Sequence, residues 1–201
     1  GAILAFVSAP GFDPNDFVPV LTQETYARHL DDPDKPLLNR ASGGGYAPGS
    51  TFKPVTALAG LTMGYPDTQE YFCSGVFRYG QMRLRCANRW GHGPLAVRSA
   101  LKASCNTFFC NLGCEVGTNA LCSAARALGL GEATGLDFTD DRAGVVPDAT
   151  WKMRVYGEQW VPGDLVQMSI GQGMLLASPL QMALLAGAIG TGYRVTPHVK
   201  A

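Results

Sequence analysis

The sequence predicts an α/β fold that is mostly helical, with a buried strand near its start. Two observations lead to this fold class. Apolar residues recur with a helical period in several segments after residue 50. Residues 2–7 form an uninterrupted apolar run that stops at Ser8-Ala9-Pro10-Gly11, as expected of a buried strand. With 201 residues, 46% of them hydrophobic, the chain has enough apolar side chains for the core of one domain.

The remaining elements follow in chain order. Residues 13–40 are rich in proline and aspartate and predict a polar connection that contains a short helix near 22–30. The loop at 72–89 is compatible with a hairpin. The longest apolar stretch, 174–190, is interrupted by polar residues and proline and is shorter than the roughly 20 residues of a membrane-spanning helix, so it predicts a buried helix. Longer helices are expected at 51–64, 95–103, 105–116, 118–128 and 178–189.

The segment Tyr46-Ala47-Pro48-Gly49-Ser50-Thr51-Phe52-Lys53 places a serine and a lysine three residues apart, directly after a Pro-Gly turn. At the start of a helix these two side chains share one face, about a turn apart. A serine hydroxyl needs a base to act as a nucleophile, and a lysine with a lowered pKa can serve. The free N–H groups of a helix start also stabilise an oxyanion. Ser50 and Lys53 are therefore the predicted nucleophile and base.

Two further segments bear on this prediction. Ser99 and Lys102 have the same spacing, but they follow no turn and lie inside a helical pattern, so we expect ordinary helix residues there. The triplet Ser104-Cys105-Asn106 opens an apolar segment and can direct its two outer side chains into a shared cleft. A Ser-x-x-Lys motif followed by such a triplet is typical of penicillin-binding proteins and class A β-lactamases. Their third motif, Lys-Thr-Gly, is absent from this sequence.

Other segments extend the resemblance over the whole chain. They are residues 1–10, Leu38-Asn39-Arg40, Ser169-Ile170-Gly171-Gln172-Gly173 and Ser178-Pro179-Leu180-Gln181-Met182-Ala183. With them, the chain resembles the class B penicillin-binding proteins. Cys73-Ser74-Gly75, Arg85-Cys86 and Gly91-His92-Gly93 resemble the elongation type within that class.

The resemblance implies a fold of the penicillin-binding protein/serine β-lactamase type, with much of the central antiparallel sheet outside the chain. Residues 1–201 would form a partial transpeptidase domain that stops before Lys-Thr-Gly, so we expect the isolated chain to be impaired. As a D,D-transpeptidase, Ser50 would attack the D-Ala-D-Ala bond of a stem peptide or a β-lactam ring. Lys53 would deprotonate Ser50, Ser104 would relay the proton to the leaving amine, and Asn106 would bind the substrate backbone or hold Lys53.

The resemblance also implies partners and a location. The partners would be peptidoglycan stem peptides, β-lactam antibiotics and, for the full-length protein, the glycan polymerase of the elongation complex that sets cell shape. The protein would lie on the periplasmic face of the membrane, anchored by an N-terminal helix that this chain lacks. Sixteen basic and sixteen acidic residues balance to zero, which argues against a nucleic-acid partner. No organic cofactor is expected.

Three thiols and one imidazole, Cys73, Cys86, His92 and Cys105, make up the ligand set of a closed tetrahedral zinc site within residues 72–105. The middle residue of the triplet should point away from the cleft, so a zinc ion there would brace the triplet from behind. Disulfides and plain buried thiols remain alternatives. The other cysteines, Cys110, Cys114 and Cys122, are expected to be core residues, and His29 and His198 surface residues.

We call residues 72–89 the cysteine-rich loop. Four arginines cluster around it: Arg78, Arg83, Arg85 and Arg89. They indicate either a solvated face or a contact with a carboxylate-bearing peptidoglycan strand.

Three alternative functions remain open from the sequence. A β-lactam sensor or receptor domain would share the serine and the lysine. A serine β-lactamase-like hydrolase would need a carboxylate for deacylation, for which Glu158 and Asp164 are the candidates. A zinc-braced scaffold would keep only contacts to substrate.

Overall fold

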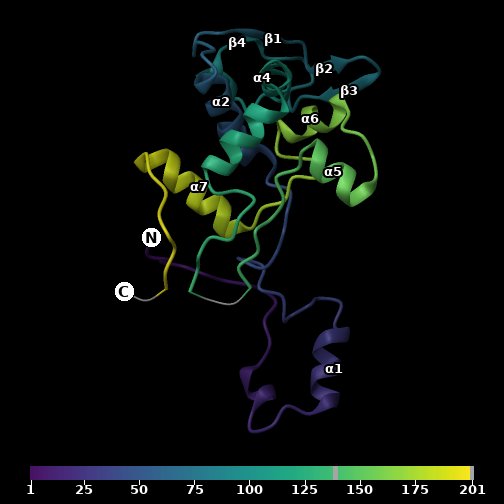
Figure 1. The fold of residues 1–201 in the computed structure, drawn as a ribbon, viewed down its shortest axis with the longest axis vertical. Coiled ribbons are helices and arrows are strands. Elements are labelled where there is room, and N and C mark those ends of the chain that lie inside the picture. The colour runs from purple at the N-terminus through teal and green to yellow at the C-terminus, as the bar shows by residue number, and fades with distance from the viewer. Residues whose placement is uncertain (138–139, 200–201) are drawn as a thin grey trace.

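The computed structural model describes residues 1–137 and 140–199. Residues 138–139 and 200–201, the latter the last two of the sequence, lie outside the described residues. Figure 1 shows a helical body with small strands at one end. In chain order the elements are η1 Pro14–Phe17, α1 Gln23–Asp31, η2 Gly49–Phe52, α2 Lys53–Thr62, β1 Tyr71–Cys73, β2 Val76–Tyr79, β3 Met82–Arg85, β4 Gly93–Leu95, α3 Val97–Lys102, α4 Asn106–Ala127, α5 Ala149–Tyr156, α6 Pro162–Met168 and α7 Pro179–Thr191.

The core of the body lies between α2 and α4. Phe52 at the end of η2 and Val55 in the first turn of α2 are fully buried, as are Phe108 and Phe109 from the first turn of α4. Burying such side chains contributes about 1.5–3 kcal/mol each relative to exposing them. The same packing holds the beginnings of the two helices together, and these beginnings carry the predicted catalytic residues.

Two small antiparallel sheets cover one end of α4 (Figure 1). In the first, β1 pairs with β4 so that Cys73 lies opposite Gly93. In the second, β2 pairs with β3 as a hairpin whose Arg78 lies opposite Arg83. Residues 72–89 therefore contain the hairpin with which the sequence is compatible. Its paired strands bring the two ends of this cysteine-rich loop together.

Most expected helices are confirmed, and their caps explain where they begin. The Thr22 side chain accepts a hydrogen bond from Thr25 N at 3.1 Å and caps α1. Ser178 caps α7 in the same way through Gln181 N at 3.2 Å. The segments 105–116 and 118–128 form one long helix, α4, interrupted by the non-helical backbone of Gly117.

The expected strand at residues 2–7 is wrong. Among the residues that the structure describes, this segment forms one bridge, from Ala2 to His198, while Leu4 is 97% exposed and Val7 is 78% exposed. A strand is stable only when neighbours satisfy its backbone and cover its apolar face. Within the described residues, the segment around 198 is the one partner that pairs with it. Residue 95 also differs from expectation, because it ends β4 instead of opening a helix.

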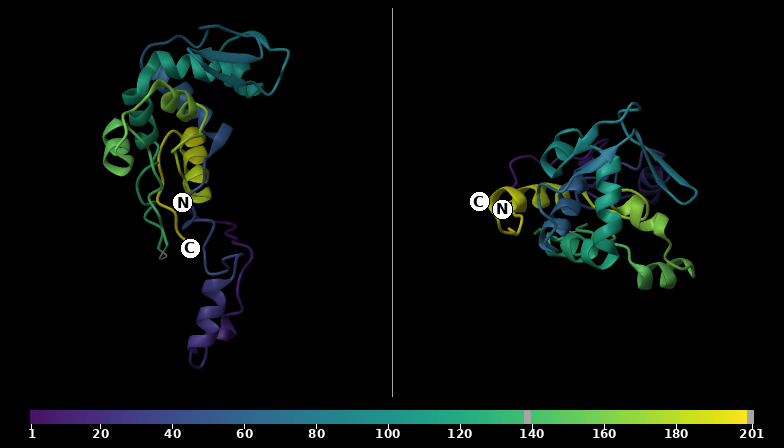
Figure 2. Two further views of the ribbon diagram at one scale, coloured as in Figure 1. Left: turned by 90° about the vertical axis from the view of Figure 1, so that its right-hand side faces the viewer. Right: turned by 90° about the horizontal axis from the view of Figure 1, so that it is seen from above.

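Residues 10–40 form an arm that carries α1 and extends away from the body (Figures 1 and 2). The arm has its own small cluster, in which the ring of His29 stacks on Phe17 and its Nε2 lies 2.9 Å from Asp16 Oδ2. His29 is buried, so its expected surface position is wrong; the expectation failed because its partners come from a separate segment. His198 is exposed, as expected.

Among the described residues, no helix has both the length and the apolar character needed to cross a bilayer.

Candidate active site and metal cluster

Ser50 lies in the short η2 turn that leads directly into α2, and Ser50 is exposed to solvent. The turn begins at Gly49, whose positive φ of 59° suits glycine, and Gly49 N donates to Gly171 O at 2.7 Å. A Cβ atom on Gly171 would lie only 2.1 Å from Gly49 O. The backbone around Gly171 therefore packs directly behind the turn that presents Ser50.

Lys53, the first residue of α2, reaches across to the predicted triplet. Its side chain is 1% exposed, and its Nζ donates to Ser104 O at 2.6 Å, Ser104 Oγ at 3.0 Å and Asn106 Oδ1 at 2.7 Å. These acceptors match the three donors of a lysine ammonium group. No hydrogen bond joins Ser50 Oγ to Lys53 Nζ within the described part of the chain, so the lysine is oriented by the triplet and not by the serine.

The environment of Lys53 makes its ammonium form easier to deprotonate. Burial away from water lowers the pKa of Lys53, and the nearby Cys86 and Cys105 act in the opposite direction with a smaller effect. A lysine can accept a proton only when it is neutral, so this direction suits a base.

The backbone at the end of α3 places the triplet opposite Lys53. Ser104 has a positive φ of 48°, and its N–H donates to Leu101 O at 3.0 Å, which ends the helix. A non-glycine residue in this region costs roughly 1–2 kcal/mol, and such strain is concentrated at functional sites. Asn106 then begins α4, and its Nδ2 donates to Arg85 O at 3.1 Å, so its side chain is fixed at both ends.

The second serine–lysine pair is an ordinary part of α3. Ser99 Oγ accepts from Ala96 N at 3.1 Å and donates to Ala96 O at 2.9 Å, which closes the start of the helix. Lys102 is exposed in the last turn. The expectation for this pair is confirmed.

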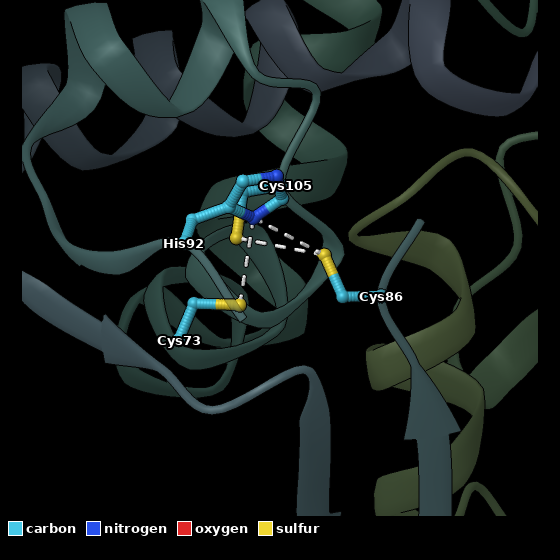
Figure 3. A group of neighbouring side chains, drawn as sticks. All are labelled: Cys73, Cys86, His92 and Cys105. Carbon is cyan, nitrogen blue, oxygen red and sulfur yellow. Dashed lines mark hydrogen bonds between the residues drawn. The ribbon is translucent and has the colours of Figure 1, made fainter. Parts of the chain in front are cut away.

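The side chains of the four predicted metal ligands point toward one another (Figure 3). One donor atom from each of Cys73, Cys86, His92 and Cys105 lies within 4.8 Å of all the others. His92 Nδ1 is 3.6 Å from both Cys73 Sγ and Cys86 Sγ, and Cys86 Sγ is 3.8 Å from Cys105 Sγ. The loop and the start of α4 therefore converge on one point.

These separations fit a tetrahedral zinc ion. Zinc bonds of about 2.3 Å to sulfur and about 2.0 Å to nitrogen at tetrahedral angles place two sulfurs about 3.8 Å apart and sulfur and nitrogen about 3.5 Å apart. A disulfide would need sulfurs about 2.05 Å apart, and the three thiols of the cluster, Cys73, Cys86 and Cys105, are free. The cluster can therefore hold a metal ion.

The acidities of the thiols differ within the cluster. Burial alone would raise the pKa of Cys73, but the polar groups around its thiol, those of Thr107, Gly75 and His92, outweigh burial and lower this pKa to about 6. Burial and the neighbouring thiols raise the pKa of Cys105 to about 12. A divalent cation would stabilise all three thiolates at once, because metal binding releases the thiol protons.

The remaining cysteines are structural, as expected: Cys110 and Cys122 are buried and Cys114 is partly buried. The two candidate carboxylates for deacylation instead contact Lys152, since Asp164 Oδ2 lies 2.8 Å and Glu158 Oε2 lies 3.5 Å from its Nζ. Neither carboxylate hydrogen-bonds a residue of the predicted site in the described part of the chain. The expectation that Glu158 or Asp164 serves deacylation is therefore wrong.

Two supporting contacts were not anticipated from the motifs. The Gly171 backbone packs on Gly49, and Thr56 Oγ1 in α2 donates to Ser169 O at 2.8 Å. Both come from the segment Ser169-Ile170-Gly171-Gln172-Gly173. Its two glycines were a signal of close backbone approach, but the sequence does not say which backbone they approach.

Comparison with known proteins identifies relatives of the whole chain. The family model of the penicillin binding protein transpeptidase domain matches residues 1–201. Peptidoglycan D,D-transpeptidase MrdA of Acinetobacter baumannii is 37% identical over 203 residues, which cover 99% of this chain and 30% of that protein. The chain therefore spans about a third of the length of this curated relative.

Solved structures agree with this result. PBP2 of Helicobacter pylori in complex with MreC matches with a TM-score of 0.90 and 33% identity, over 96% of this chain and 36% of that one. PBP2 of Pseudomonas aeruginosa in complex with WCK 5153 matches with a TM-score of 0.88 and 34% identity, over 96% and 43% of the two chains. These neighbours confirm the α/β fold class expected from the sequence.

Proposed function

The chain belongs to the penicillin-binding protein transpeptidase family, and on that premise we propose that it forms part of an elongation-type peptidoglycan D,D-transpeptidase that acts through an acyl-enzyme on Ser50. Residues 1–201 would supply the part of the transpeptidase domain that carries the nucleophile, its base and the triplet.

One observation carries this proposal: a buried lysine, one turn from an exposed serine, is held by both outer residues of the triplet. Lys53 Nζ lies 3.0 Å from Ser104 Oγ and 2.7 Å from Asn106 Oδ1. An isolated Ser-x-x-Lys pattern occurs by chance, and Ser99 with Lys102 is an instance in this same chain. The contacts across 51 and 53 residues of sequence distinguish the first motif from the second.

The proposed reaction follows from these contacts. Ser50 Oγ attacks the carbonyl carbon of the D-Ala-D-Ala bond while its proton passes to neutral Lys53. The proton then moves through Ser104 Oγ to the amine of the leaving D-alanine as the C–N bond breaks, which leaves an ester on Ser50. An amine from a neighbouring stem peptide attacks that ester and restores the serine. A β-lactam would acylate the same hydroxyl, with the C–N bond of its ring breaking and the freed amine taking up the proton.

Asn106 has a positioning part in this scheme. Its Oδ1 holds Lys53 while one N–H of its Nδ2 donates to Arg85 O. This arrangement supports the role of holding the lysine, and the second N–H of Nδ2 remains for the substrate backbone.

We further propose that Cys73, Cys86, His92 and Cys105 bind a structural zinc ion. The ion would supply a rigid cross-link between the loop and α4. Because Cys105 lies between Ser104 and Asn106, its fixed position would fix the direction of both neighbouring side chains. This proposal rests on the match between the donor separations and tetrahedral geometry.

For the full-length protein, we propose a location on the periplasmic face of the membrane and a role in cell shape through a glycan polymerase partner. The support is family membership and the elongation-type resemblance of the cysteine-rich loop. A solved relative, PBP2 of Helicobacter pylori, is in complex with MreC, which supports a proposed second assembly partner for this protein.

A time course with fluorescent penicillin tests the enzymatic proposal. The full-length protein should label stoichiometrically, Ser50→Ala should not label, and Ser99→Ala should label like the wild type. A slow loss of label, over many minutes, is expected of a transpeptidase; loss within seconds would indicate a hydrolase, and labelling of Ser50→Ala would refute the assignment.

A further inference from the structure

The hairpin formed by β2 and β3 has two different faces. Its pairing places Phe77 opposite Leu84 on one face, where they pack toward α4 and the core. Because side chains alternate along a strand, Arg78, Arg83 and Arg85 share the other face. All three are exposed, and we call them the arginine face.

The charges of this face are unbalanced within the protein. Arg78 lies directly opposite Arg83 in the ladder, and like charges in that position destabilise a sheet. In the described residues, no carboxylate forms an ion pair with any of the three. Other exposed arginines of the chain do have such partners: Arg28 pairs with Asp16, Arg126 with Asp148 and Arg194 with Glu132. The arginine face is therefore a destabilising charge cluster that an external anion would neutralise.

The backbone of Arg85, at the base of the hairpin, borders the candidate active site. Arg85 O accepts from Asn106 Nδ2 at 3.1 Å, and Asn106 Oδ1 holds Lys53. From Arg85 the strand leads outward to the tip of the hairpin, at a rise of about 3.3–3.4 Å per residue. Arg83 and the facing Arg78 thus lie about 7 Å further from the site than Arg85. Figure 2 shows the hairpin at the end of the body remote from α1.

We propose that the arginine face binds the free carboxylates of the peptidoglycan strand whose stem peptide reaches Ser50. This inference rests on the proposed function and extends it by naming how the strand is held. Stem peptides carry carboxylates along their length, and a guanidinium group forms charge-assisted, bidentate hydrogen bonds with a carboxylate. An anionic strand that runs from Ser50 past Asn106 meets Arg85 first, and then the pair at the tip.

Binding of soluble, uncross-linked peptidoglycan strands to the full-length protein tests the proposal. Ser50→Ala serves as the background, so that no turnover occurs. Arg78→Glu/Arg83→Glu is compared with Arg142→Glu/Arg154→Glu, which makes the same change in net charge at exposed arginines on other parts of the chain. Native strands are compared with strands whose carboxylates have been amidated, which keeps their shape and removes their charge.

The expected result is a dissociation constant about tenfold or more higher for the hairpin variant, a change of less than about twofold for the control variant, and weak binding of amidated strands to every variant. Raising the salt concentration should weaken wild-type binding and leave the hairpin variant little changed. A single Arg83→Glu change should also raise the melting temperature slightly, because it creates an opposite-charge pair with Arg78.

Equal binding by the hairpin variant and the wild type would overturn the proposal, as would equal binding of amidated strands. Arginine-dependent binding to vesicles that contain phosphatidylglycerol, without such binding to strands, would assign the face to a lipid surface and overturn it as well. Labelling of wild-type Ser50 by penicillin is measured separately. Normal labelling with unchanged strand binding would refute this inference alone, whereas absent labelling would refute the proposed function.

Discussion

Lys53 Nζ lies 3.0 Å from Ser104 Oγ and 2.6 Å from Ser104 O, so one residue of the triplet holds the lysine through both its side chain and its backbone. The contact joins the start of α2 to the turn before α4. The same two helices pack against each other in the core. Packing of the core and geometry of the candidate site are thus one structural unit.

Replacement of Lys53 tests the role of the amine. Lys53→Met removes the amine that donates to Ser104 and Asn106, so the acylation rate by penicillin should fall by about 10²–10⁴-fold. Lys53→Arg should fail similarly, because a guanidinium group does not release its proton to become a base. Stopped-flow measurement of acylation gives the rates, and Lys102→Met is the matched control that should keep the wild-type rate.

Replacement of Asn106 by aspartate tests the electrostatics of the lysine. A carboxylate at Oδ1 would stabilise the ammonium form and so raise the pKa of Lys53, which burial lowers in the wild type. Because only the neutral amine acts as a base, the acid limb of the acylation rate should move to higher pH. The pH profile of the second-order rate constant measures this shift; a limb that stays in place, or moves to lower pH, would contradict the assignment.

Replacement of Gly171 tests the support behind Ser50. Gly171→Ala would bring a Cβ to 2.1 Å from Gly49 O and would place alanine at a φ of 73°. The expected loss of stability is about 2 kcal/mol or more, together with slower acylation. Gly187→Ala is the control, since nothing lies within 4 Å of its Cβ position in α7. It should be neutral or stabilising by up to about 1 kcal/mol, as read from thermal unfolding.

Metal analysis tests the cluster. The purified protein should hold about one zinc ion per chain, Cys86→Ser should hold little, and Cys114→Ser, a partly buried thiol outside the cluster, should hold as much as the wild type. Chelation should lower the melting temperature by roughly 5 °C or more, which corresponds to about 2 kcal/mol for a domain of this size. A disulfide between any two of the cluster cysteines in the native protein, found by mass spectrometry, would contradict the zinc proposal.

The sequence predicted those features whose information is local. The expected helices at 22–30 and 178–189 begin at Thr22 and Ser178, the residues that cap α1 and α7 in the structure, and the Pro-Gly turn marked the start of the helix that carries Lys53. Residues 2–7 were misjudged because strand formation depends on distant partners. The short helices α5 and α6 were missed because, at 8 and 7 residues, they are too short to show a clear apolar period.

The same distinction applies to the candidate site. The serine–lysine spacing and the triplet could be read directly, and so could the four ligands of the cluster. Their mutual contacts could not, because they join residues 51 and 53 positions apart. The same is true of the burial of His29 and of the approach of Gly171 to Gly49, each of which depends on how separate segments pack.

The central claim is that Ser50 is the residue that forms the acyl-enzyme, in a site organised by Lys53, Ser104 and Asn106. Peptide-level mass spectrometry of the full-length protein after a brief exposure to penicillin tests it most directly. The account predicts that the penicilloyl adduct is on Ser50 in the wild type and is strongly reduced in Lys53→Met. An adduct on Ser99, Ser104 or any other residue, or no adduct in a folded protein, would contradict it.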